Sequence, residues 1–199
     1  SAPPAAAWRS LGPTAVVTGS FGLVSGRVSA LALDPFDATG NTLYAGTTGG
    51  GVWVSTNAAT GQSANVVFRS LTDDPAVLDV APDTSISIGA LSVQPGGTGV
   101  LLAGTGDPND ALDSYYGAGL LRSSDSGKTW ILIQGTTDVT TGMGAMDHGF
   151  LGEGFAGFAW SSLNPQLVVA AVSQSWDSYV VQAISPGYSY SGLYYSIDG

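Results

Sequence analysis

Short apolar runs separated by glycine, proline and small polar residues recur along the whole chain. Within each run, hydrophobic residues tend to alternate with small or polar ones, which is the period of a strand, and no run sustains the period of a helix. Glycine accounts for 29 of the 199 residues, so tight turns are expected between the runs. The pattern predicts an all-β chain built from short strands.

One arrangement of runs occurs three times. Each copy has a strand that ends in a proline turn, at Pro35, Pro95 and Pro165, then a second apolar strand, a loop of variable length, and a third strand that leads into Ser-x-Asp or Ser-x-Asn. A fourth strand is predicted over 130–133. Long repeats of four short strands are typical of β-propeller blades. We therefore expect four-stranded antiparallel blades, and the expected boundaries are 27–71, 86–134 and 155–199, the last incomplete, within a propeller fragment over 13–199.

Three blades are fewer than the roughly four to eight that pack around a propeller axis. The sequence ends at Ser196-Ile197-Asp198-Gly199, inside a motif that the second copy completes. We therefore expect the remainder of a larger ring to come from a continuation of the chain or from a cleaved second chain.

The composition narrows the classes of partner. Only 10% of the residues are charged, with five Lys and Arg against fifteen Asp and Glu, so the net charge is −10 and basic surface is scarce. No apolar stretch approaches the ~20 residues of a membrane-spanning helix. We expect neither nucleic acid nor a membrane as a partner.

The cellular compartment is inferred from the start of the chain. The sequence has no cysteine, so there are no disulfides that would indicate an oxidising compartment. Residues 1–12 are predicted to be an Ala/Pro-rich spacer with a lead-in strand, the kind of segment that remains after a signal peptide is removed. We expect a secreted protein, extracellular or periplasmic.

The second copy contains a complete Asp-box, also called the bacterial neuraminidase repeat. The carboxylate of Asp125 is expected to accept main-chain N–H groups across a tight turn, Gly127 to supply a positive φ, and Trp130 to bury its ring between blades. We interpret the motif as structural and not catalytic. Its predicted residues are Ser123, Asp125, Gly127, Thr129 and Trp130, with Ser196 and Asp198 starting another copy.

With these motifs the chain resembles Asp-box propellers, most closely the xyloglucanase-type two-propeller glycoside hydrolases, with sortilin-like receptors and sialidases more distant. The resemblance implies a carbohydrate-active protein. It also places the family's blade-one catalytic Asp at Thr48, within 44–51, and a threonine hydroxyl cannot serve as one carboxylate of a glycosidase pair. Sialidases hold the substrate carboxylate with three arginines, and here Arg27 is the one arginine expected to be free for such work.

In a propeller, the loops between strands two and three and after strand four open on one face. The long insertions all lie on that face, so we expect a ligand to bind there. The insertions span 72–87, 106–117, 134–154 and 173–191.

The chemistry in these loops leaves alternatives open. The loop from residue 107 combines oxygen ligands with aromatic rings, which suits calcium, sugar hydroxyls or a solvated turn. A carboxylate near the single histidine suits a general acid or base, or a polar loop. The rings of the last insertion suit stacking on pyranose faces, or packing of the loop.

The candidates are named by role. The candidate catalytic residues are Asp147, Glu153, His148 and Asp107. The candidate ligand-binding residues are Trp53, Tyr115, Tyr116, Trp176, Asp177, Tyr188 and Tyr190. No cofactor is required, and calcium is the possible metal, with candidate ligands Asp107, Asn109, Asp110 and Asp113.

Two functions are compatible with these features. The first is a glycoside hydrolase acting on a polysaccharide or oligosaccharide, with an acid other than residue 48. The second is a non-catalytic module that binds glycan or protein with the same face, and Thr48 favours it.

Overall fold

The computed structural model describes residues 11, 15–74, 78–79, 86–109, 111–112, 114–138, 146–181 and 190–199, with the backbone alone for 78–79, 137–138 and 146–147. Within this part of the chain, the regular elements are sixteen strands and two 3-10 helices, η1 (Ser63–Asn65) and η3 (Trp176–Val180). The all-β class expected from the sequence is confirmed. Neither helix has the length or apolar character needed to cross a membrane.

Blade one is a four-stranded antiparallel sheet in which each strand pairs with the next along the chain. Its strands alternate because hairpin turns at 34–42 and 48–50 return the chain directly beside itself. The strands are β3 (Val28–Leu33), β4 (Leu43–Thr47), β5 (Gly51–Ser55) and β6 (Arg69–Ser70).

Blade two repeats this order and carries one additional strand. The two residues of β7 (Leu78–Asp79) pair in parallel with β11 and extend the sheet at its outer edge, which the repeat did not predict. The repeated strands are β8 (Ile88–Val93), β9 (Leu101–Thr105), β10 (Leu120–Ser123) and β11 (Trp130–Ile133).

Blade three has three strands in the described part of the chain. They are β14 (Glu153–Trp160), β15 (Val168–Gln174) and β16 (Gly192–Ser196).

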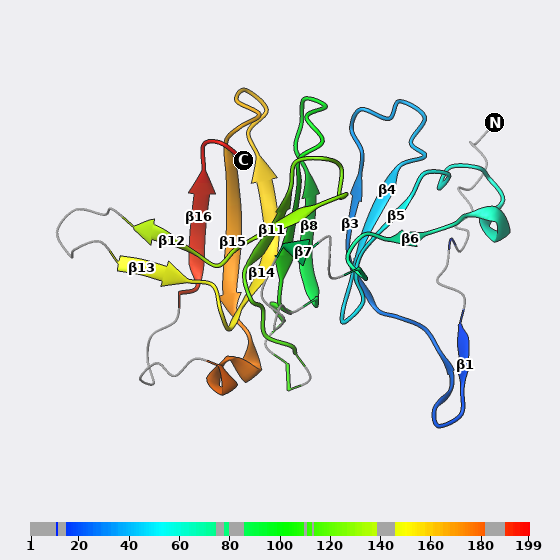
Figure 1. Ribbon diagram of the computed structural model, residues 1–199, viewed down its shortest axis with the longest axis horizontal. Coiled ribbons are helices and arrows are strands. Elements are labelled where there is room, and N and C mark those ends of the chain that lie inside the picture. The colour runs from blue at the N-terminus through cyan, green and yellow to red at the C-terminus, as the bar shows by residue number, and fades with distance from the viewer. Residues whose placement is uncertain are drawn as a thin grey trace, which may run out of the picture.

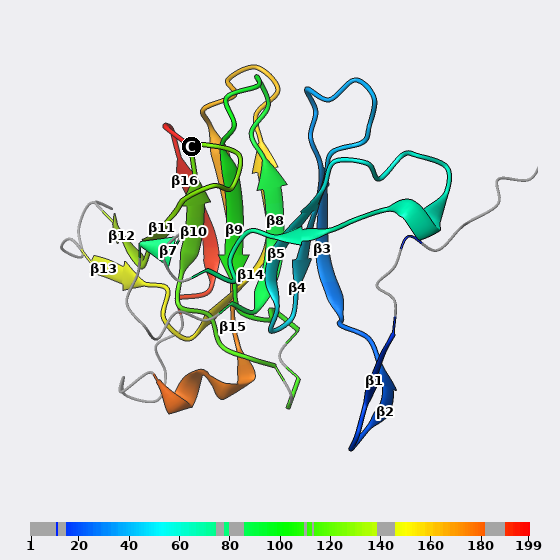
Figure 2. The same ribbon diagram turned by 45° about the vertical axis from the view of Figure 1, so that its right-hand side comes forward.

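The three sheets stand face to face, with their first strands side by side (Figures 1 and 2). Strand β8 contacts both β3 and β14. Each of these inner strands carries a register shift at the same place, after Val28, Ile88 and Phe155. Four-stranded up-and-down sheets whose first strands converge are the arrangement of propeller blades.

Glycines allow neighbouring blades to approach closely. A Cβ on Gly46 would lie 2.6 Å from Cγ2 of Ile88, and a Cβ on Gly104 would lie 2.1 Å from Cβ of Phe155. Both Ile88 and Phe155 are almost completely buried, so each is a side chain of one blade seated against a bare backbone of the blade before it. The apolar core therefore lies between the blades.

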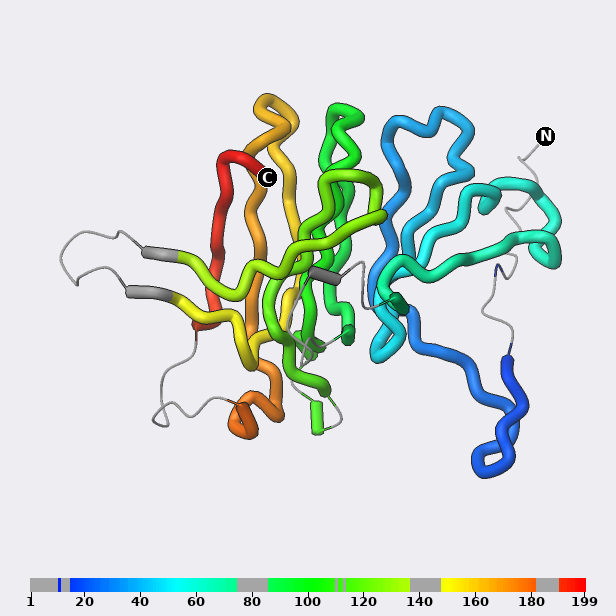
Figure 3. The backbone as a smooth tube through the Cα atoms, viewed as in Figure 1, coloured from blue at the N-terminus to red at the C-terminus, as the bar shows by residue number. Residues whose placement is uncertain are grey.

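The chain path gives the molecule two different edges (Figure 3). At the upper edge in Figure 3, short turns join the first two strands of each blade, at 34–42, 94–100 and 161–167. At the lower edge lie η3 and the loop at 106–119. We call these the turn edge and the loop-rich edge.

Two hairpins lie outside the blades. Strands β1 (Val16–Thr18) and β2 (Gly22–Val24) form a hairpin that projects beyond blade one (Figure 1). Strands β12 (Gly135–Asp138) and β13 (Met146–Gly149), which follow blade two in the sequence, form a second hairpin that extends past β16 at the left of Figure 1. The repeat predicted neither of them. Most of the expected spacer and lead-in strand, 1–12, lies outside the described residues.

The Asp-box forms a tight turn at the end of β10. The carboxylate of Asp125 accepts the main-chain N–H groups of Lys128 and Thr129 at 3.0 and 2.9 Å and the hydroxyl hydrogens of Ser123 and Thr129 at 2.8 and 2.7 Å. Gly127 has a φ of 83°. These donors favour the ionised carboxylate, and they lower the pKa of Asp125 from 3.8 to about 2.

The other blades use shorter versions of the same turn. In blade one, the hydroxyl of Ser55 donates to Asn57 at 3.0 Å, and Asn57 in turn accepts from the N–H of Val67. In blade three, Ser196 donates to Asp198 at 2.5 Å. Trp130, which follows the complete motif, is 1% exposed in the core between blades one and two.

The close approach of the blades predicts the effect of adding one methyl group. Replacing Gly104 by alanine should lower the free energy of unfolding by about 1–3 kcal/mol, because the new Cβ overlaps Phe155. Denaturant unfolding measures the change. The matched control is Gly157→Ala, since no atom lies within 4 Å of the Cβ position there; equal losses in both variants would contradict the packing argument.

The Asp-box predicts how stability depends on pH. Because the folded-state pKa of Asp125 lies below its usual value of 3.8, its stabilisation is complete above that value and is lost as pH falls toward 2. Hydrogen bonds from Thr39 and Thr42 also lower the pKa of Asp37 to about 2. The stabilisation from Asp37 is therefore lost over the same range of falling pH. Urea unfolding should therefore show that acid lowers the free energy of unfolding less in Asp125→Asn than in the unchanged protein. The control is Asp73→Asn, at an exposed carboxylate outside the turn, in which acid should lower the free energy of unfolding as much as in the unchanged protein.

Candidate functional site on the loop-rich edge

An ion pair joins blades one and two at the loop-rich edge. The guanidinium of Arg27 donates from Nη2 to Oδ2 of Asp107 at 3.0 Å and from Nε to the hydroxyl of Thr48 at 3.2 Å. The other carboxylate oxygen of Asp107 accepts the main-chain N–H and the amide of Asn109 at 3.0 and 2.6 Å. The expectation that Arg27 is free is therefore wrong, because a buried carboxylate holds it.

This arrangement also defines what Asp107 can do. Both of its oxygens accept hydrogen bonds, one of them from a cation, so the geometry suits an ionised carboxylate and not a proton donor. The same bonds compete with a calcium ion for Asp107, and its expected co-ligands Asp110 and Asp113 lie outside the described residues. In the described part of the chain, no three His, Asp or Glu side chains gather to hold a metal.

Hydrogen bonds across blades fix the loops of this edge as one platform. The hydroxyl of Ser175 donates to the carbonyl of Asp107 at 3.0 Å, and that of Ser173 donates to Pro108 at 3.2 Å. The N–H of Gly117 donates to the carbonyl of Glu153 at 2.9 Å, where a Cβ on Gly117 would lie 2.4 Å from the same oxygen. Blades two and three therefore present their loops in a single fixed relation.

Exposed aromatic rings stand on this platform from two blades. Tyr115 belongs to the loop of blade two, while Trp176 and Tyr179 belong to η3 at the end of blade three. Their exposed fractions are 61%, 48% and 73%. Tyr116 is half-buried beside them. The structure thus places exposed rings on two of the four insertions, whose loops are hydrogen-bonded to each other.

Asp177 lies among these rings and is the most unusual carboxylate of the site. Its burial raises the pKa above 3.8, against the opposing effect of its own N–H and that of Tyr116. One carboxylate oxygen, Oδ1, is buried and has no hydrogen-bond partner among the described residues. Burial therefore makes Asp177 take up its proton at a higher pH than an exposed aspartate would.

Glu153 and His148 both contact Tyr190, Glu153 through the tyrosine's main-chain N–H and His148 through its ring. Glu153 is fully buried, and its oxygens accept the N–H of Tyr190 at 3.3 Å and the hydroxyl of Ser191 at 3.4 Å. The ring of His148 lies 5.2 Å from that of Tyr190, and its Nδ1 lies 3.2 Å from the hydroxyl of Tyr194.

The hydroxyl of Tyr194 connects Tyr190 and His148. It donates to the carbonyl of Tyr190 and lies at hydrogen-bond distance from Nδ1 of His148, where the tautomer of the imidazole decides which atom donates.

The remaining predicted residues lie away from this platform or outside the description. The indole N–H of Trp53 donates to the carbonyl of Gly50 at 2.7 Å and so anchors a turn of blade one. Asp147 is on β13, where its backbone pairs with Thr137. Its side chain and the whole of Tyr188 are outside the described residues.

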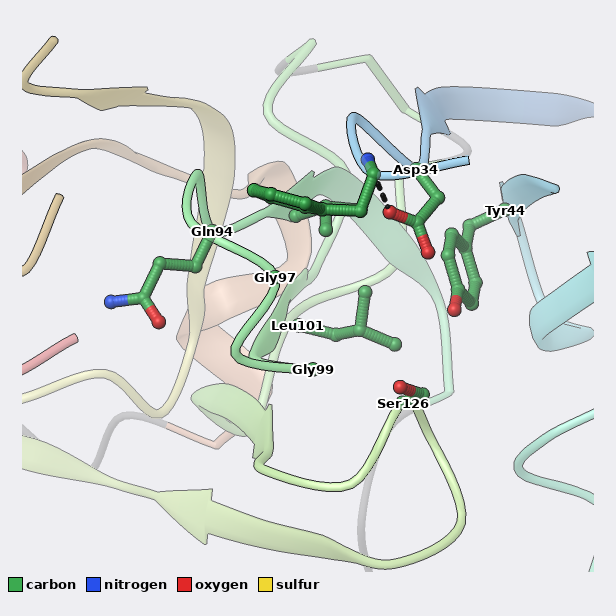
Figure 4. Close-up of a pocket in the computed structure, with 9 residues that line it drawn as sticks. Asp34, Tyr44, Gln94, Gly97, Gly99, Leu101 and Ser126 are labelled. Atoms are coloured by element: carbon green, nitrogen blue, oxygen red, sulfur yellow. Dashed lines mark hydrogen bonds between the residues drawn. The ribbon is translucent and has the colours of Figure 1, made fainter. Parts of the chain in front are cut away.

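A small cavity lies at the opposite, turn edge, between blades one and two (Figure 4). Its volume is about 90 Å³, and its walls include Asp34, Tyr44, Leu101 and Ser126. Burial and the nearby charge of Asp34 raise the pKa of Tyr44. Since ligand pockets are typically about 300–1,000 Å³, this cavity has room for water but not for a sugar chain.

Comparison with known proteins finds solved structures that are similar to this chain. The chain is similar to the crystal structure of the GH74 xyloglucanase from Xanthomonas campestris, with 20% sequence identity and a TM-score of 0.45 over 86% of this chain. It spans about a fifth of that protein, 22% of its length. No protein-family model and no curated protein matches the sequence.

Proposed function

We propose that this chain is a secreted, carbohydrate-active protein that binds polysaccharide across the loop-rich edge. The observation that carries the proposal is the group of exposed rings, Tyr115, Trp176 and Tyr179, on loops that are hydrogen-bonded into one platform. Aromatic faces supply apolar contact area to the faces of sugar rings, and a fixed platform lowers the entropy lost on binding.

The charge of the chain favours a neutral polysaccharide. With five basic against fifteen acidic residues, the protein repels polyanions. Arg27, the basic residue at this edge, already has Asp107 as its counter-ion. The polar groups beside the rings are carboxylates and main-chain amides, which match the hydroxyl groups of a neutral sugar.

Hydrolysis is the second candidate function, and Asp177 is the observation that favours it. A glycosidase needs one carboxyl group that is protonated and one that is ionised, in surroundings that separate their pKa values. Burial raises the pKa of Asp177, whereas Asp107 is ion-paired with Arg27. The two belong to loops joined by the Ser175 hydrogen bond. Asp177 would be the general acid in place of the family's residue at Thr48.

Removing a ring from the platform should weaken polysaccharide binding. Trp176→Ala and Tyr115→Ala should each lose binding to soluble neutral polysaccharides, by about tenfold for a loss of ~1.4 kcal/mol of ring contact. Affinity electrophoresis over a panel of neutral and acidic polysaccharides measures the change. Phe21→Ala is the control, because Phe21 is also exposed, at 82%, but lies in the turn of the β1–β2 hairpin; binding that is unaffected by both platform variants would refute the proposal.

Hydrolysis is tested separately by the release of reducing ends. Asp177→Asn should abolish release while retaining polysaccharide binding, because the amide keeps the shape but cannot donate a proton. In the unchanged protein, release should fall as pH rises through the raised pKa of Asp177, since the acid must be protonated. Asp198→Asn, at the turn edge, is the control. Release that survives Asp177→Asn would rule out Asp177 as the general acid, whereas no release by the unchanged protein would leave binding as the function.

A further inference from the structure

The two aromatic loops of the platform are both anchored to the main chain of Asp107. Its N–H donates to the carbonyl of Tyr115 at 2.8 Å, and its carbonyl accepts the hydroxyl of Ser175 at 3.0 Å. Tyr115 carries the exposed ring of blade two, and Ser175 directly precedes Trp176, an exposed ring of blade three. A displacement of Asp107 therefore disturbs the anchors of both loops at once.

Further main-chain bonds connect the same loops from the other side. The N–H of Gly152 donates to the carbonyl of Gly117 at 2.8 Å, and the N–H of Ser175 donates to the carbonyl of Gly152 at 3.3 Å. Asp107 and Gly117 lie at the two ends of the blade-two loop. Because the bonds form a closed path between the blades, neither loop moves relative to the other without breaking one of them.

The side chain of Asp107 is buried beside a cation from blade one. It is 7% exposed, and its Oδ2 accepts from Nη2 of Arg27 at 3.0 Å. Arg27 directly precedes β3, and its Nε donates to the hydroxyl of Thr48 at 3.2 Å. A buried carboxylate is stable when an opposite charge is hydrogen-bonded to it, so blade one helps to keep Asp107 in place.

The two members of this ion pair differ in their access to water. The side chain of Arg27 is 53% exposed, so water solvates its guanidinium when the carboxylate is removed. Asp107 has no such access. Without Arg27 it is a buried charge with no counter-ion, which is strongly unfavourable, and its route to water is a movement of the loop. That movement pulls its main chain away from Tyr115 and Ser175.

We propose that Arg27 is a positioning residue of the carbohydrate site, which acts through Asp107 to hold the loops of Tyr115 and Trp176 in the register that one sugar chain bridges. The inference rests on the proposed function. It narrows the ligand to an oligosaccharide long enough to contact both loops. When one molecule makes both contacts, the second forms at a high effective concentration, and this gain is lost when the geometry forbids both together.

Ligands of two lengths test the inference. The probes are the disaccharide and the hexasaccharide of the neutral polysaccharide that the unchanged protein retains most strongly in affinity electrophoresis, and nuclear magnetic resonance titration at neutral pH measures their binding. Arg27→Met should weaken binding of the hexasaccharide by about tenfold, the loss expected for one aromatic ring. It should leave binding of the disaccharide unchanged, because a ligand on one loop does not depend on the register.

Paired variants separate positioning from direct contact of Arg27 with the sugar. Asp107→Asn should weaken hexasaccharide binding less than Arg27→Met, because the remaining guanidinium is exposed to water and asparagine still accepts the N–H of Asn109. The double variant Arg27→Met with Asp107→Asn should recover most of the lost affinity, since no charge is left buried without a partner. If Arg27 touched the sugar directly, the second substitution would recover nothing.

Two further arginine variants are the controls. Arg69→Met removes the same charge from an exposed arginine of β6 and should bind the hexasaccharide as the unchanged protein does. Arg27→Lys keeps a cation opposite Asp107 and should retain most of the affinity. Far-ultraviolet circular dichroism checks that the strands of every variant are intact.

The outcomes distinguish this inference from the function on which it rests. An unchanged protein that binds no polysaccharide of the panel refutes both. If the unchanged protein binds and Trp176→Ala weakens binding, the proposed function stands. In that case the role of Arg27 is wrong if Arg27→Met binds the hexasaccharide normally, loses the disaccharide equally, or is not improved by Asp107→Asn. Should Arg27→Met not fold, a folded double variant that has lost hexasaccharide binding would overturn the inference.

Discussion

The structure depends on the close seating of one blade's inner strand against the bare backbone of the preceding blade. Ile88 over Gly46 and Phe155 over Gly104 set the separation and orientation of the sheets, because a methyl group at either glycine would overlap the next blade. Short sheets of this kind have little interior of their own. Most of the buried apolar surface is created when the blades meet, so the blades stabilise one another.

The loop-rich edge follows from that seating. Once blades two and three are fixed, Ser173 and Ser175 reach the carbonyls of Pro108 and Asp107, and the loops from both blades become one surface. The charged groups are part of this framework. Asp107 is buried because Arg27 from blade one reaches it, and Arg27 is oriented because Thr48 accepts its Nε hydrogen. Exposed aromatic rings are therefore prominent at this edge, beside the half-buried Asp177.

Repetition made the fold predictable from the sequence, because three copies of one strand pattern reinforce a signal that is weak in any single strand. The β7 strand and the two hairpins have no counterpart in other copies, so the pattern contained no signal for them. The position of two of the inserted loops at one edge was predictable (Figure 3), but the contacts of their residues were not. Residue types identified Asp107 and Asp177 as candidates, whereas the ion pair with Arg27 joins residues 80 positions apart. Such a contact depends on blade packing and leaves no local trace.

The parallel pairing of β7 with Trp130 and Ile131 has a consequence for how this protein avoids aggregation. An outermost strand normally presents unpaired amide and carbonyl groups that recruit strands from other molecules into amyloid-like stacks. Because β7 pairs with β11, part of the outer edge of β11 is already hydrogen-bonded to the chain's own backbone. Blade two is thereby guarded against the non-specific addition of foreign strands.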